Sequence, residues 1–512
     1  MNELLKNIIT LLPVFFPVAA GILVAATKRR GVHKHSFSKQ AMIVIFGVQF
    51  VLTVLSFVFG TDRLVMFSFT DLITAVLKKD LISDIFILMI SGIFFLAGIY
   101  ATDYMRHDDR KNEKEQNVKT LSGRTFFGFY LMVWGVLIGL SEAGNLLTFY
   151  MFYELMTVTS AVLVIHDMTK EAVFAAKKYI YYSIAGASCA LFGFAFMAKA
   201  SGGALEFVSG GSISGLAGKD LNQVLVSVFL MIIGFGAKAG MFPLHGWLPT
   251  AHPVAPAPAS AVLSGIICKA GVLGILRVIF YLVGTEVLKG TWVQYAFMSL
   301  SLLTVFMGSM LAYKEKVLKK RLAYSTVSQV SYILFGFSCM NPIAFFGALF
   351  HIVFHAVLKT LLFLNAGSVI FATDRHECPE LCGIGKAMPI TFATFATASL
   401  GLIGIPPVCG FVSKWYLCLG ALDLKESVIG YIGVAVLLVS ALLTAGYLLS
   451  IVIVAFFPGQ DFEGFDENLE RSKKVRTGMV AVMVILAVLC VLLGVFANTV
   501  YDLAYDTVYA LF

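Results

Sequence analysis

Apolar runs of about twenty residues recur along almost the whole chain, and each is long enough to cross the hydrocarbon core of a bilayer as a helix. Hydrophobic residues make up 59% of the 512 positions, and charged residues only 13%. No arrangement of soluble domains could bury that much apolar surface. The sequence therefore predicts an all-α polytopic membrane protein with about fourteen transmembrane helices.

The expected helices fall into four regions. Residues 1–125 hold helices 1 to 3 with their loops, 126–285 a first five-helix repeat (helices 4 to 8), 286–456 a second (helices 9 to 13), and 457–512 a cytoplasmic loop and helix 14. The helices are expected to start near Ile8, Ala41, Leu81, Phe126, Asn145, Ala176, Gln223, Ala259, Tyr295, Leu322, Ala344, Ile390, Ile429 and Thr477.

Clusters of basic residues indicate which loops face the cytoplasm, because short cytoplasmic loops are enriched in Lys and Arg. Two clusters follow the first and the ninth expected helix, and by parity both fall on the same side. They are Lys28, Arg29, Arg30, Lys34 and Lys39, and Lys314, Lys316, Lys319, Lys320 and Arg321. This pattern predicts a multi-pass protein of the cell membrane with its amino and carboxyl termini outside. Basic residues in cytoplasmic loops, next to anionic lipid headgroups, then account for the formal charge of +8. No nucleic-acid partner is expected.

Two lysines, Lys238 and Lys269, lie in runs so apolar that they must be within the membrane. An ammonium at the centre of a bilayer costs at least about 2.5 to 3.5 kcal/mol, so it must face protein or water and have partners. Five prolines lie between the two lysines: Pro243, Pro249, Pro253, Pro256 and Pro258. We expect ions to move through this part of the chain.

Glu154 lies inside the apolar run 146–165. Its carboxylate must pair with a cation or take up a proton, because desolvation disfavours the charged form. The candidate partner is Lys238. A structural ion pair between two helices is the alternative, but ionisable residues within membranes are functional by default.

Pro243 should break helix 7 beside Lys238, since proline removes a backbone donor and frees a carbonyl. Irregular backbone at membrane depth is tolerated only where it is buried in protein or lines a wet cavity. His245 follows the break. Because histidine titrates near physiological pH, this position favours a proton relay over a satisfied core histidine.

A second break is expected in helix 12, at Pro406 and Pro407, and Lys414 follows it. Two proline-interrupted helices, each with a buried lysine and separated by five spans, suggest two inverted five-helix repeats. Many transporters place such repeats around a site at the middle of the membrane.

Between the two breaks, His351, His355 and Lys359 are spaced i, i+4, i+8 and form one polar stripe on an apolar helix. The stripe is predicted to pass protons between the two halves. A zinc site is the alternative, but no Glu follows the first His as a zincin motif requires. Cys378 and Cys382 match no standard zinc spacing, so no metal site is predicted.

These motifs together resemble the antiporter-like subunit family shared by respiratory complex I, membrane-bound hydrogenases and the multisubunit Mrp sodium/proton antiporters. The motifs that carry the resemblance are NLLTFYMFYELM (145–156), KAGMFPLHGWLP (238–249), APAPASA (255–261) with Lys269, RLAYSTVSQ (321–329), the His351, His355 and Lys359 stripe, and GIPP (404–407) with Lys414. The resemblance covers about residues 84–414 and is specific because the motifs occur in combination.

The resemblance implies roles for the buried residues. Glu154 and Lys238 would be the coupled pair of a first half-channel, Lys269 and the histidine stripe the central connection, and Lys414 the end of a second half-channel. It implies no redox cofactor in this chain. The lysine at 414 and the short carboxyl-terminal region resemble the D-type Mrp subunit or hydrogenase relatives. Thr250 departs from the family, which usually has an acid there.

The implied function is a proton-translocating subunit of a multisubunit cation/proton antiporter or of a redox-driven ion pump. Its partners would be other membrane subunits, and its cargo protons, with sodium as a further candidate. One alternative is a subunit of an NADH:quinone oxidoreductase-like or hydrogenase complex that contributes to electron-transport-coupled pumping. A second is a stand-alone solute transporter. No dinucleotide loop or iron–sulfur cysteine cluster predicts a catalytic site in the chain itself.

Overall fold

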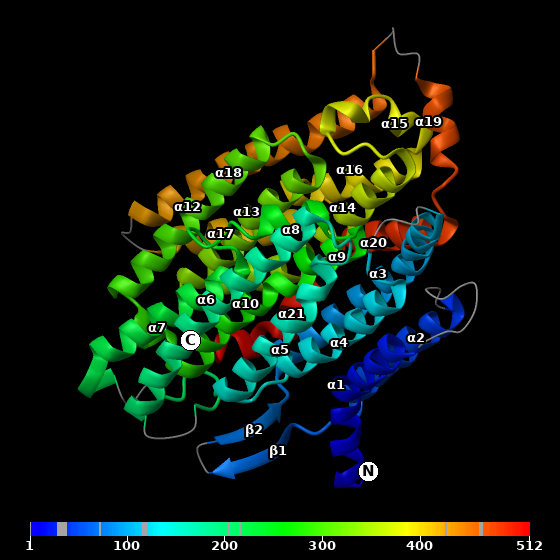
Figure 1. Ribbon diagram of the computed structural model, residues 1–512. Helices are drawn as coiled ribbons and strands as arrows, with labels where there is room; N and C mark the ends of the chain where they lie inside the picture. Colours follow the sequence, from blue (N-terminus) through cyan, green and yellow to red (C-terminus); the bar gives the residue numbers. More distant parts are fainter. Residues whose placement is uncertain are drawn as a thin grey trace.

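The computed structural model describes residues 2–27, 38–70, 73–114, 120–201, 205–213, 217–424, 428–459 and 464–512. It is a bundle of long helices with one β-hairpin at its edge (Figure 1). The first half contains α1 (Glu3–Ala26), α2 (Lys39–Phe59), β1 (Arg63–Thr70), β2 (Ile73–Lys78), α3 (Leu81–Lys114), α4 (Gly123–Ser141), α5 (Leu146–Val164), α6 (Lys170–Ser201), α7 (Ala217–Ala239), α8 (Leu248–Val254), α9 (Ala257–Val262), the π-helix η2 (Leu263–Ile267), α10 (Cys268–Leu276) and the π-helix η3 (Arg277–Val283).

The second half continues in the same helical pattern. It contains α11 (Thr285–Leu288), α12 (Trp292–Lys314), α13 (Leu318–Ser338), α14 (Pro342–Thr373), the 3-10 helix η4 (Cys378–Leu381), α15 (Ile384–Ala387), α16 (Pro389–Ile403), α17 (Gly410–Leu422), α18 (Val428–Phe456), α19 (Phe465–Ser472), α20 (Thr477–Val495) and α21 (Ala497–Tyr509).

In the described part of the chain, 12 helical segments are long and apolar enough to cross a membrane. The protein is therefore a multi-pass membrane protein. Two of the expected spans are not in this set. α13 is rich in polar residues, both in its first turn, with Lys319, Lys320 and Arg321, and further along, as at Ser328 and Gln329. The span expected near Ile390 is divided into α16 and α17.

Polar side chains fix where several helices begin. Asn145 accepts a hydrogen bond from the backbone N–H of Thr148 at 2.8 Å and so caps α5, and Asn341 does the same for Ala344 at the start of α14. Such caps satisfy backbone donors that have no partner in the first turn of a helix.

The β-hairpin is an element that the expected all-α architecture did not include. Strands β1 and β2 are antiparallel, with Arg63 opposite Lys78 and Val65 opposite Val76, and two irregularities interrupt the register. The segment is rich in β-branched and aromatic residues but far too short to span a membrane. The hairpin lies between α2 and α3, and its strands are too short to resemble a transmembrane helix in the sequence.

The hairpin marks one end of the bundle, which we call the hairpin end. There the backbone N–H of Gly144, between α4 and α5, donates to Val76 at 2.8 Å, and that of Phe207 donates to Gly144 at 2.9 Å. The carboxyl terminus is at the same end, because Ser209 donates to the carbonyl of Ala510 at 3.1 Å. Thr61 bonds Thr10 of α1 at 2.9 Å, so both termini are near this end. That it faces outside remains a prediction, and Lys28, Arg29, Arg30 and Lys34 lie outside the described residues.

Two breaks interrupt helices in the interior. The chain leaves α7 at Gly240, whose φ of 84° favours glycine, and resumes as α8 at Leu248. It leaves α16 at Gly404, with φ 96°, and resumes as α17 at Gly410. Freed carbonyls find local donors, as when Trp247 Nε1 donates to the carbonyl of Ala237 at 2.9 Å.

The centre of the bundle is formed by the segment Ala257–Val283 and by α14. In the most apolar stretch of Ala257–Val283 every residue is buried, and in the corresponding stretch of α14 94% of the residues are buried. In α1 and α2 the buried share is only 28%. The peripheral helices expose apolar faces, as expected where lipid surrounds a protein. Ionisable side chains on these two central segments are therefore enclosed by other parts of the protein.

Candidate functional site

Lys238 lies on the last turn of α7, immediately before the first break, and is completely buried. Its Nζ donates to three hydroxyls, of Tyr179 at 2.6 Å, Thr157 at 3.0 Å and Ser183 at 3.0 Å. It also lies 4.2 Å from the centroid of the Tyr179 ring. The ammonium is thus held by neutral oxygens and an aromatic face, which satisfy its three N–H donors.

Glu154, the predicted partner of Lys238, lies half-buried on α5. Its carboxylate accepts a hydrogen bond from Tyr150 at 3.0 Å. Its charge also acts on Lys238, whose three hydrogen bonds go to Thr157, Tyr179 and Ser183. The structure therefore brings the two residues into one region without direct contact, and their pairing remains a prediction.

Lys269 lies on α10, directly after the π-helix η2. The wide turn leaves the carbonyl of Ser264 free to accept a hydrogen bond from Lys269 Nζ at 2.7 Å. A second bond joins this Nζ to His355 Nδ1 at 2.6 Å. Lys269 and the middle of the predicted stripe are thus in direct contact.

The closeness of α7 to α10 depends on Gly271. A Cβ at this position would lie 2.3 Å from the carbonyl oxygen of Phe235 and 3.1 Å from the Cβ of Lys238. The absence of a side chain lets the helix of Lys269 approach the helix of Lys238. No direct hydrogen bond between described residues links the two lysines, so they form separate clusters in neighbouring helices.

The predicted stripe lies on α14, and all three of its side chains are fully buried. His351 contacts Ser413 through Nδ1 at 2.9 Å and Gln329 through Nε2 at 3.1 Å. The rings of His351 and His355 stack with centroids 5.8 Å apart. His355 Nε2 finds no hydrogen-bond partner among the described residues.

Lys359, the third residue of the stripe, turns toward α13. Its Nζ donates to the carbonyl of Leu322 at 3.0 Å and to the hydroxyl of Ser325. It does not contact the two histidines directly, so the i, i+4, i+8 spacing yields a branch toward α13 and not a continuous line of contacts.

Lys414 lies on α17, just after the second break. Its Nζ donates to the carbonyls of Leu402 and Ile403 at 2.7 and 2.9 Å, the oxygens that the end of α16 leaves unpaired. A cation is favourable at this negative end of a helix. The same Nζ lies 5.0 Å from the ring centroid of Tyr332, whose ring stacks on His351 at 5.6 Å. Tyr332 therefore connects Lys414 to the histidines.

His245 lies in the first break and is only partly buried. Its ring stacks on Phe242 with centroids 6.0 Å apart, and its Nδ1 has no hydrogen-bond partner among the described residues. Thr250, in the position where the family usually has an acid, accepts a hydrogen bond from Lys178 at 3.0 Å. The cation of Lys178 is thus held at this position by a hydroxyl and not by a carboxylate.

Lys319 and His252 are buried groups that sequence reasoning missed, as it missed Glu142. Lys319 was assigned to a basic loop, but only 7% of it is exposed and its Nζ donates to the carbonyls of Pro253 and Ala255 at 3.2 and 2.5 Å. His252 is fully buried, stacks on Phe363 at 4.6 Å, and neither ring nitrogen has a described partner. The signal for His252 was its place within the proline-rich segment between Lys238 and Lys269.

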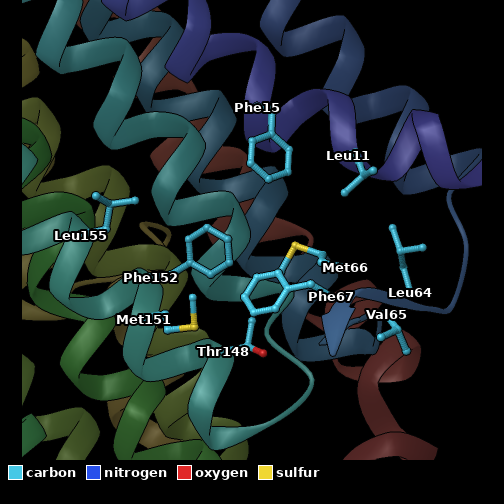
Figure 2. A pocket seen from close by; sticks show the side chains of 10 residues that line it. All are labelled: Leu11, Phe15, Leu64, Val65, Met66, Phe67, Thr148, Met151, Phe152 and Leu155. Carbon is cyan, nitrogen blue, oxygen red and sulfur yellow. The ribbon is translucent and has the colours of Figure 1, made fainter. Parts of the chain in front are cut away.

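An apolar pocket of about 410 Å³ opens between α1, β1 and α5 (Figure 2). It is lined by Leu11, Phe15, Leu64, Val65, Met66, Phe67, Thr148, Met151, Phe152 and Leu155. None of the predicted site residues lines it. Its lining includes exposed apolar side chains such as Phe15 and Met151, so it belongs to the lipid-facing or subunit-facing surface.

The cysteines and histidines offer no metal-binding geometry in the described ranges. Cys378 and Cys382 are both free thiols, and Cys382 bonds the carbonyl of Pro458 at 3.8 Å. Within the part of the chain that the structure describes, no group of three or more His, Cys, Asp or Glu side chains is placed to hold a metal ion.

Among the described residues, twelve helical segments apolar enough to cross a membrane accompany buried lysines and histidines, which defines a polytopic membrane protein with ionisable groups in its interior. The chain belongs to the NADH:quinone oxidoreductase/Mrp antiporter transmembrane family, whose model matches residues 143–457.

Individual relatives agree with this assignment. The chain is 33% identical to hydrogenase-4 component B of Escherichia coli (strain K12) over 84% of its own length, and spans only 63% of that relative. It is 31% identical to NADH-quinone oxidoreductase subunit N of Desulforudis audaxviator (strain MP104C), over 73% of this chain and 71% of the relative. Its fold matches a chain in the structure of the Mrp complex from Dietzia sp. DQ12-45-1b, with a TM-score of 0.80, 20% identity and 99% of both chains covered.

Proposed function

We propose that the chain is a proton-translocating subunit of a multisubunit membrane complex. The observation that carries the proposal is a set of ionisable residues inside the bundle. Lys238 is fully buried on α7, and on the neighbouring helices the buried Lys269 contacts His355, whose ring stacks on His351. Tyr332 connects His351 to the partly buried Lys414. Buried ionisable groups are costly, and in membrane proteins they mark ion paths. Each group in this line can bind or release a proton.

Lys238 is the switch of the proposed path. Its ammonium is held by hydroxyls from α5 and α6 and is influenced by Glu154. Losing one hydrogen bond to a charged group is worth about 1.5 to 3 kcal/mol. Moving a charge through 100 mV is worth about 2.3 kcal/mol. A small movement of α5 or α6 that alters one contact therefore suffices to work against a membrane potential.

Lys269 is the residue that passes the proton to the central histidines. Its contact with His355 Nδ1 is a direct route for transfer, and the stacked rings of His355 and His351 extend it along α14. Lys414 ends the path at the second break, where carbonyls of α16 stabilise its charged form. His245 and Lys359 are side branches, toward the first break and toward α13.

We also propose that α13 and the pair α16–α17 cross the membrane, which gives about fourteen crossings in two inverted five-helix repeats with both termini outside. The similar construction of the two breaks supports this proposal. Each has a glycine of positive φ at the end of a helix and a lysine within ten residues of it, fully buried at Lys238 and partly buried at Lys414.

The proposed partners are other membrane subunits. The apolar pocket beside α5 and the exposed apolar faces of α1, α2 and α18 suit contacts with lipid or with neighbouring subunits. The relatives carry names of hydrogenase, NADH-quinone oxidoreductase and Mrp proteins. We therefore keep two candidate settings: a cation/proton antiporter of the Mrp type, with sodium as the exchanged cation, and a redox-driven pump.

The experiment uses inverted membrane vesicles that contain the chain with its native partner subunits. Vesicles are energised by the respiratory substrate of the host or by an imposed sodium gradient, and proton uptake is followed with a pH-sensitive dye. We expect Lys238→Ala, Lys269→Ala and Lys414→Ala each to reduce uptake to background. Lys289→Ala, at a side chain 42% exposed, is the matched control. The energy source that drives uptake distinguishes the two settings.

Two results would contradict the proposal. Unchanged uptake in a variant that lacks all three lysines would leave the chain a sealing scaffold. Transport by the purified chain, reconstituted without any partner, would instead support a stand-alone transporter.

A further inference from the structure

Glu142 is a buried carboxylate that the proposed path does not use. It follows the last residue of α4, and none of its surface is exposed. Its backbone is fixed on both sides, since its N–H donates to Ile138 at 3.1 Å and its carbonyl accepts from Lys78 at 2.6 Å. Neither of its carboxylate oxygens has a hydrogen-bond partner among the described residues. An ionised carboxylate without partners is among the costliest groups to bury.

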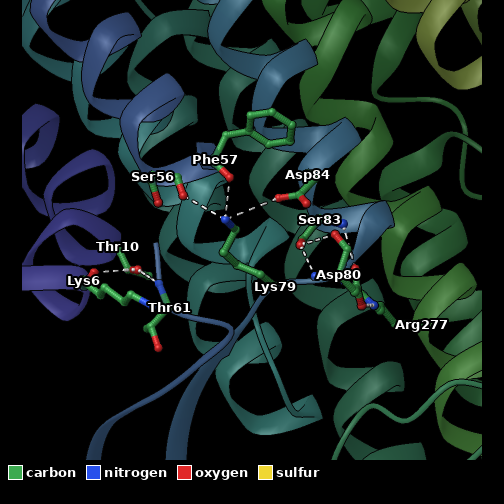
Figure 3. A network of polar contacts seen from close by, with 10 residues as sticks. All are labelled: Lys6, Thr10, Ser56, Phe57, Thr61, Lys79, Asp80, Ser83, Asp84 and Arg277. Carbon is green, nitrogen blue, oxygen red and sulfur yellow. Dashed lines mark hydrogen bonds and ion pairs between the residues drawn. The ribbon is translucent and has the colours of Figure 1, made fainter. Parts of the chain in front are cut away.

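The charges of two residues on neighbouring elements act on Glu142. These residues are Lys79 and Asp84. Lys79 donates to the carbonyls of Ser56 and Phe57 at 2.8 and 2.9 Å, so its ammonium is anchored at the end of α2 (Figure 3). It lies 4.0 Å from Asp84 Oδ1, which is itself buried and has no hydrogen-bond partner in the described ranges. The carboxylates of Asp84 and Glu142 are therefore both stabilised by the same ammonium, that of Lys79.

The adjacent charges are already paired. Asp80 binds the guanidinium of Arg277 through both oxygens, as Figure 3 shows, and accepts from the N–H of Ser83 at 2.8 Å. Arg277 also donates to the carbonyl of Ser141, next to Glu142, at 3.5 Å. The further ionisable groups on the packed elements are Lys78, which donates to the Phe207 carbonyl, Asp62, Tyr281, and the exposed pair of Arg63 and Glu206.

The charges in the buried cluster do not balance when every group is ionised. Lys79 and Arg277 supply two positive charges, while Asp80, Asp84 and Glu142 supply three negative ones. One proton on a carboxylate makes the cluster neutral. Glu142 is the member whose oxygens both lack donors, so it gains most from protonation.

We propose that Glu142 is a proton-binding residue that holds and releases one exchangeable proton at the hairpin end of the bundle. The ligand is a proton taken from water, which converts the carboxylate to a carboxylic acid and returns to water when the acid ionises. The inference goes beyond the proposed path, because Glu142 belongs to the α4–α5 loop and its carboxylate has no hydrogen bond to any described residue of that path. It holds whether or not that path operates.

The electrostatic balance agrees with this role. Burial raises the pKa of Glu142 to about 8, and the opposing pull of Lys79 is too weak to restore its ordinary value. A carboxyl group with such a pKa changes protonation state near neutral pH, where a proton carrier must work. A sodium ion is the competing ligand, but the nearby ammonium of Lys79 repels a second cation.

The test is a pH titration of the complex, reconstituted in lipid, by infrared difference spectroscopy. The carbonyl stretch of a protonated carboxyl group is distinct from the bands of a carboxylate. We expect one such band to titrate near pH 8, to disappear in Glu142→Gln and to persist in the control Glu206→Gln, which removes an exposed carboxylate at the same end of the bundle. An unchanged band in Glu142→Gln would overturn the assignment.

A second variant keeps the inference testable if Glu142→Gln does not assemble. Asp84→Asn removes the like charge that faces Glu142, so the band should titrate at lower pH. A midpoint that does not move in Asp84→Asn contradicts the cluster. A midpoint that shifts with sodium concentration, at constant ionic strength, identifies the ligand as sodium and overturns the proton assignment.

Discussion

The Nζ of Lys269 lies 2.6 Å from Nδ1 of His355, although the two residues are 86 positions apart in the chain. A lysine ammonium can only donate, so Nδ1 of His355 must accept and the proton of the neutral imidazole must be on Nε2. Nε2 has no hydrogen-bond partner among the described residues. A proton that arrives on Nδ1 therefore leaves a second, unanchored proton on the opposite side of the ring, which is the arrangement that a relay requires.

His355→Gln tests this relay. The amide oxygen of glutamine can still accept a hydrogen bond from Lys269, but it cannot carry a proton. We expect the complex to assemble and proton uptake to fall by about 100-fold, the low end of the effect of a positioned proton-transfer group. Uptake by inverted vesicles measures the rate, and the amount of assembled complex is the control. Uptake at the wild-type rate would remove His355 from the path.

Tyr179→Phe tests the hydroxyl that holds Lys238. The phenyl ring keeps the packing against Trp247, with centroids 4.8 Å apart. The hydroxyl is lost, together with its 2.6 Å hydrogen bonds to Lys238 and Ser160. The charged form of Lys238 should be destabilised by about 1.5 to 3 kcal/mol, and uptake should slow roughly tenfold or more. The matched control is Tyr181→Phe on the same helix, where the side chain is 68% exposed. Equal rates in the two variants would contradict the switch.

Asp80→Asn tests the ion pair that joins α3 to the central segment. Arg277 is fully buried, while the side chain of Asp80 keeps 20% exposure. We expect a loss of about 3 kcal/mol, the lower end of values for breaking a buried pair, seen as a lower melting temperature of the complex. Glu286→Gln, in the exposed pair with Lys289, should leave that temperature unchanged.

The same pair predicts a pH dependence of stability. Burial alone would raise the pKa of Asp80, but the Arg277 guanidinium outweighs it and lowers the pKa below its ordinary value of 3.8. The stabilisation is therefore complete above that value and is lost as the pH falls toward the lowered pKa of the folded state. The melting temperature of wild type should fall below pH 4 more steeply than that of Asp80→Asn. Parallel curves would contradict the pairing.

Gly271→Ala tests the close approach of α7 and α10. The new Cβ would meet the backbone of Phe235 and Ala239 at 2.3 and 2.8 Å, so the two helices must separate. We expect a cost of about 1 to 3 kcal/mol and slower proton uptake. Gly92→Ala is the control, because a Cβ there meets nothing within 4 Å. That substitution should be neutral or stabilising by up to about 1 kcal/mol.

The membrane class and the positions of Lys238, Lys269, Lys359 and Lys414 inside apolar runs could be predicted from sequence because both depend on local composition. A lysine in a long apolar run is visible without knowing what surrounds it. The breaks beside Lys238 and Lys414 could be predicted for the same reason, since proline acts on its own helix.

The contacts of these lysines could not be predicted in the same way. The hydroxyls around Lys238 come from positions 55 to 81 residues away, and only the packing of α5, α6 and α7 brings them together. The pairing of Glu154 with Lys238 was predicted from charge alone and stays a prediction, while the three hydroxyls that accept hydrogen bonds from the ammonium were not foreseen. Lys319 was assigned to a loop because a cluster of charges at the start of a helix has the same composition as a loop.

The π-helical turn at Leu263–Ile267 makes the central segment sensitive to its length. A π turn accommodates one more residue than an α turn, and each residue of an α-helix rotates its successor by about 100°. A one-residue deletion there would restore a regular helix and turn Lys269 and Arg277 away from His355 and Asp80 together. Natural relatives should therefore tolerate substitutions in this turn far more readily than insertions or deletions, even where the side chains themselves make no polar contact.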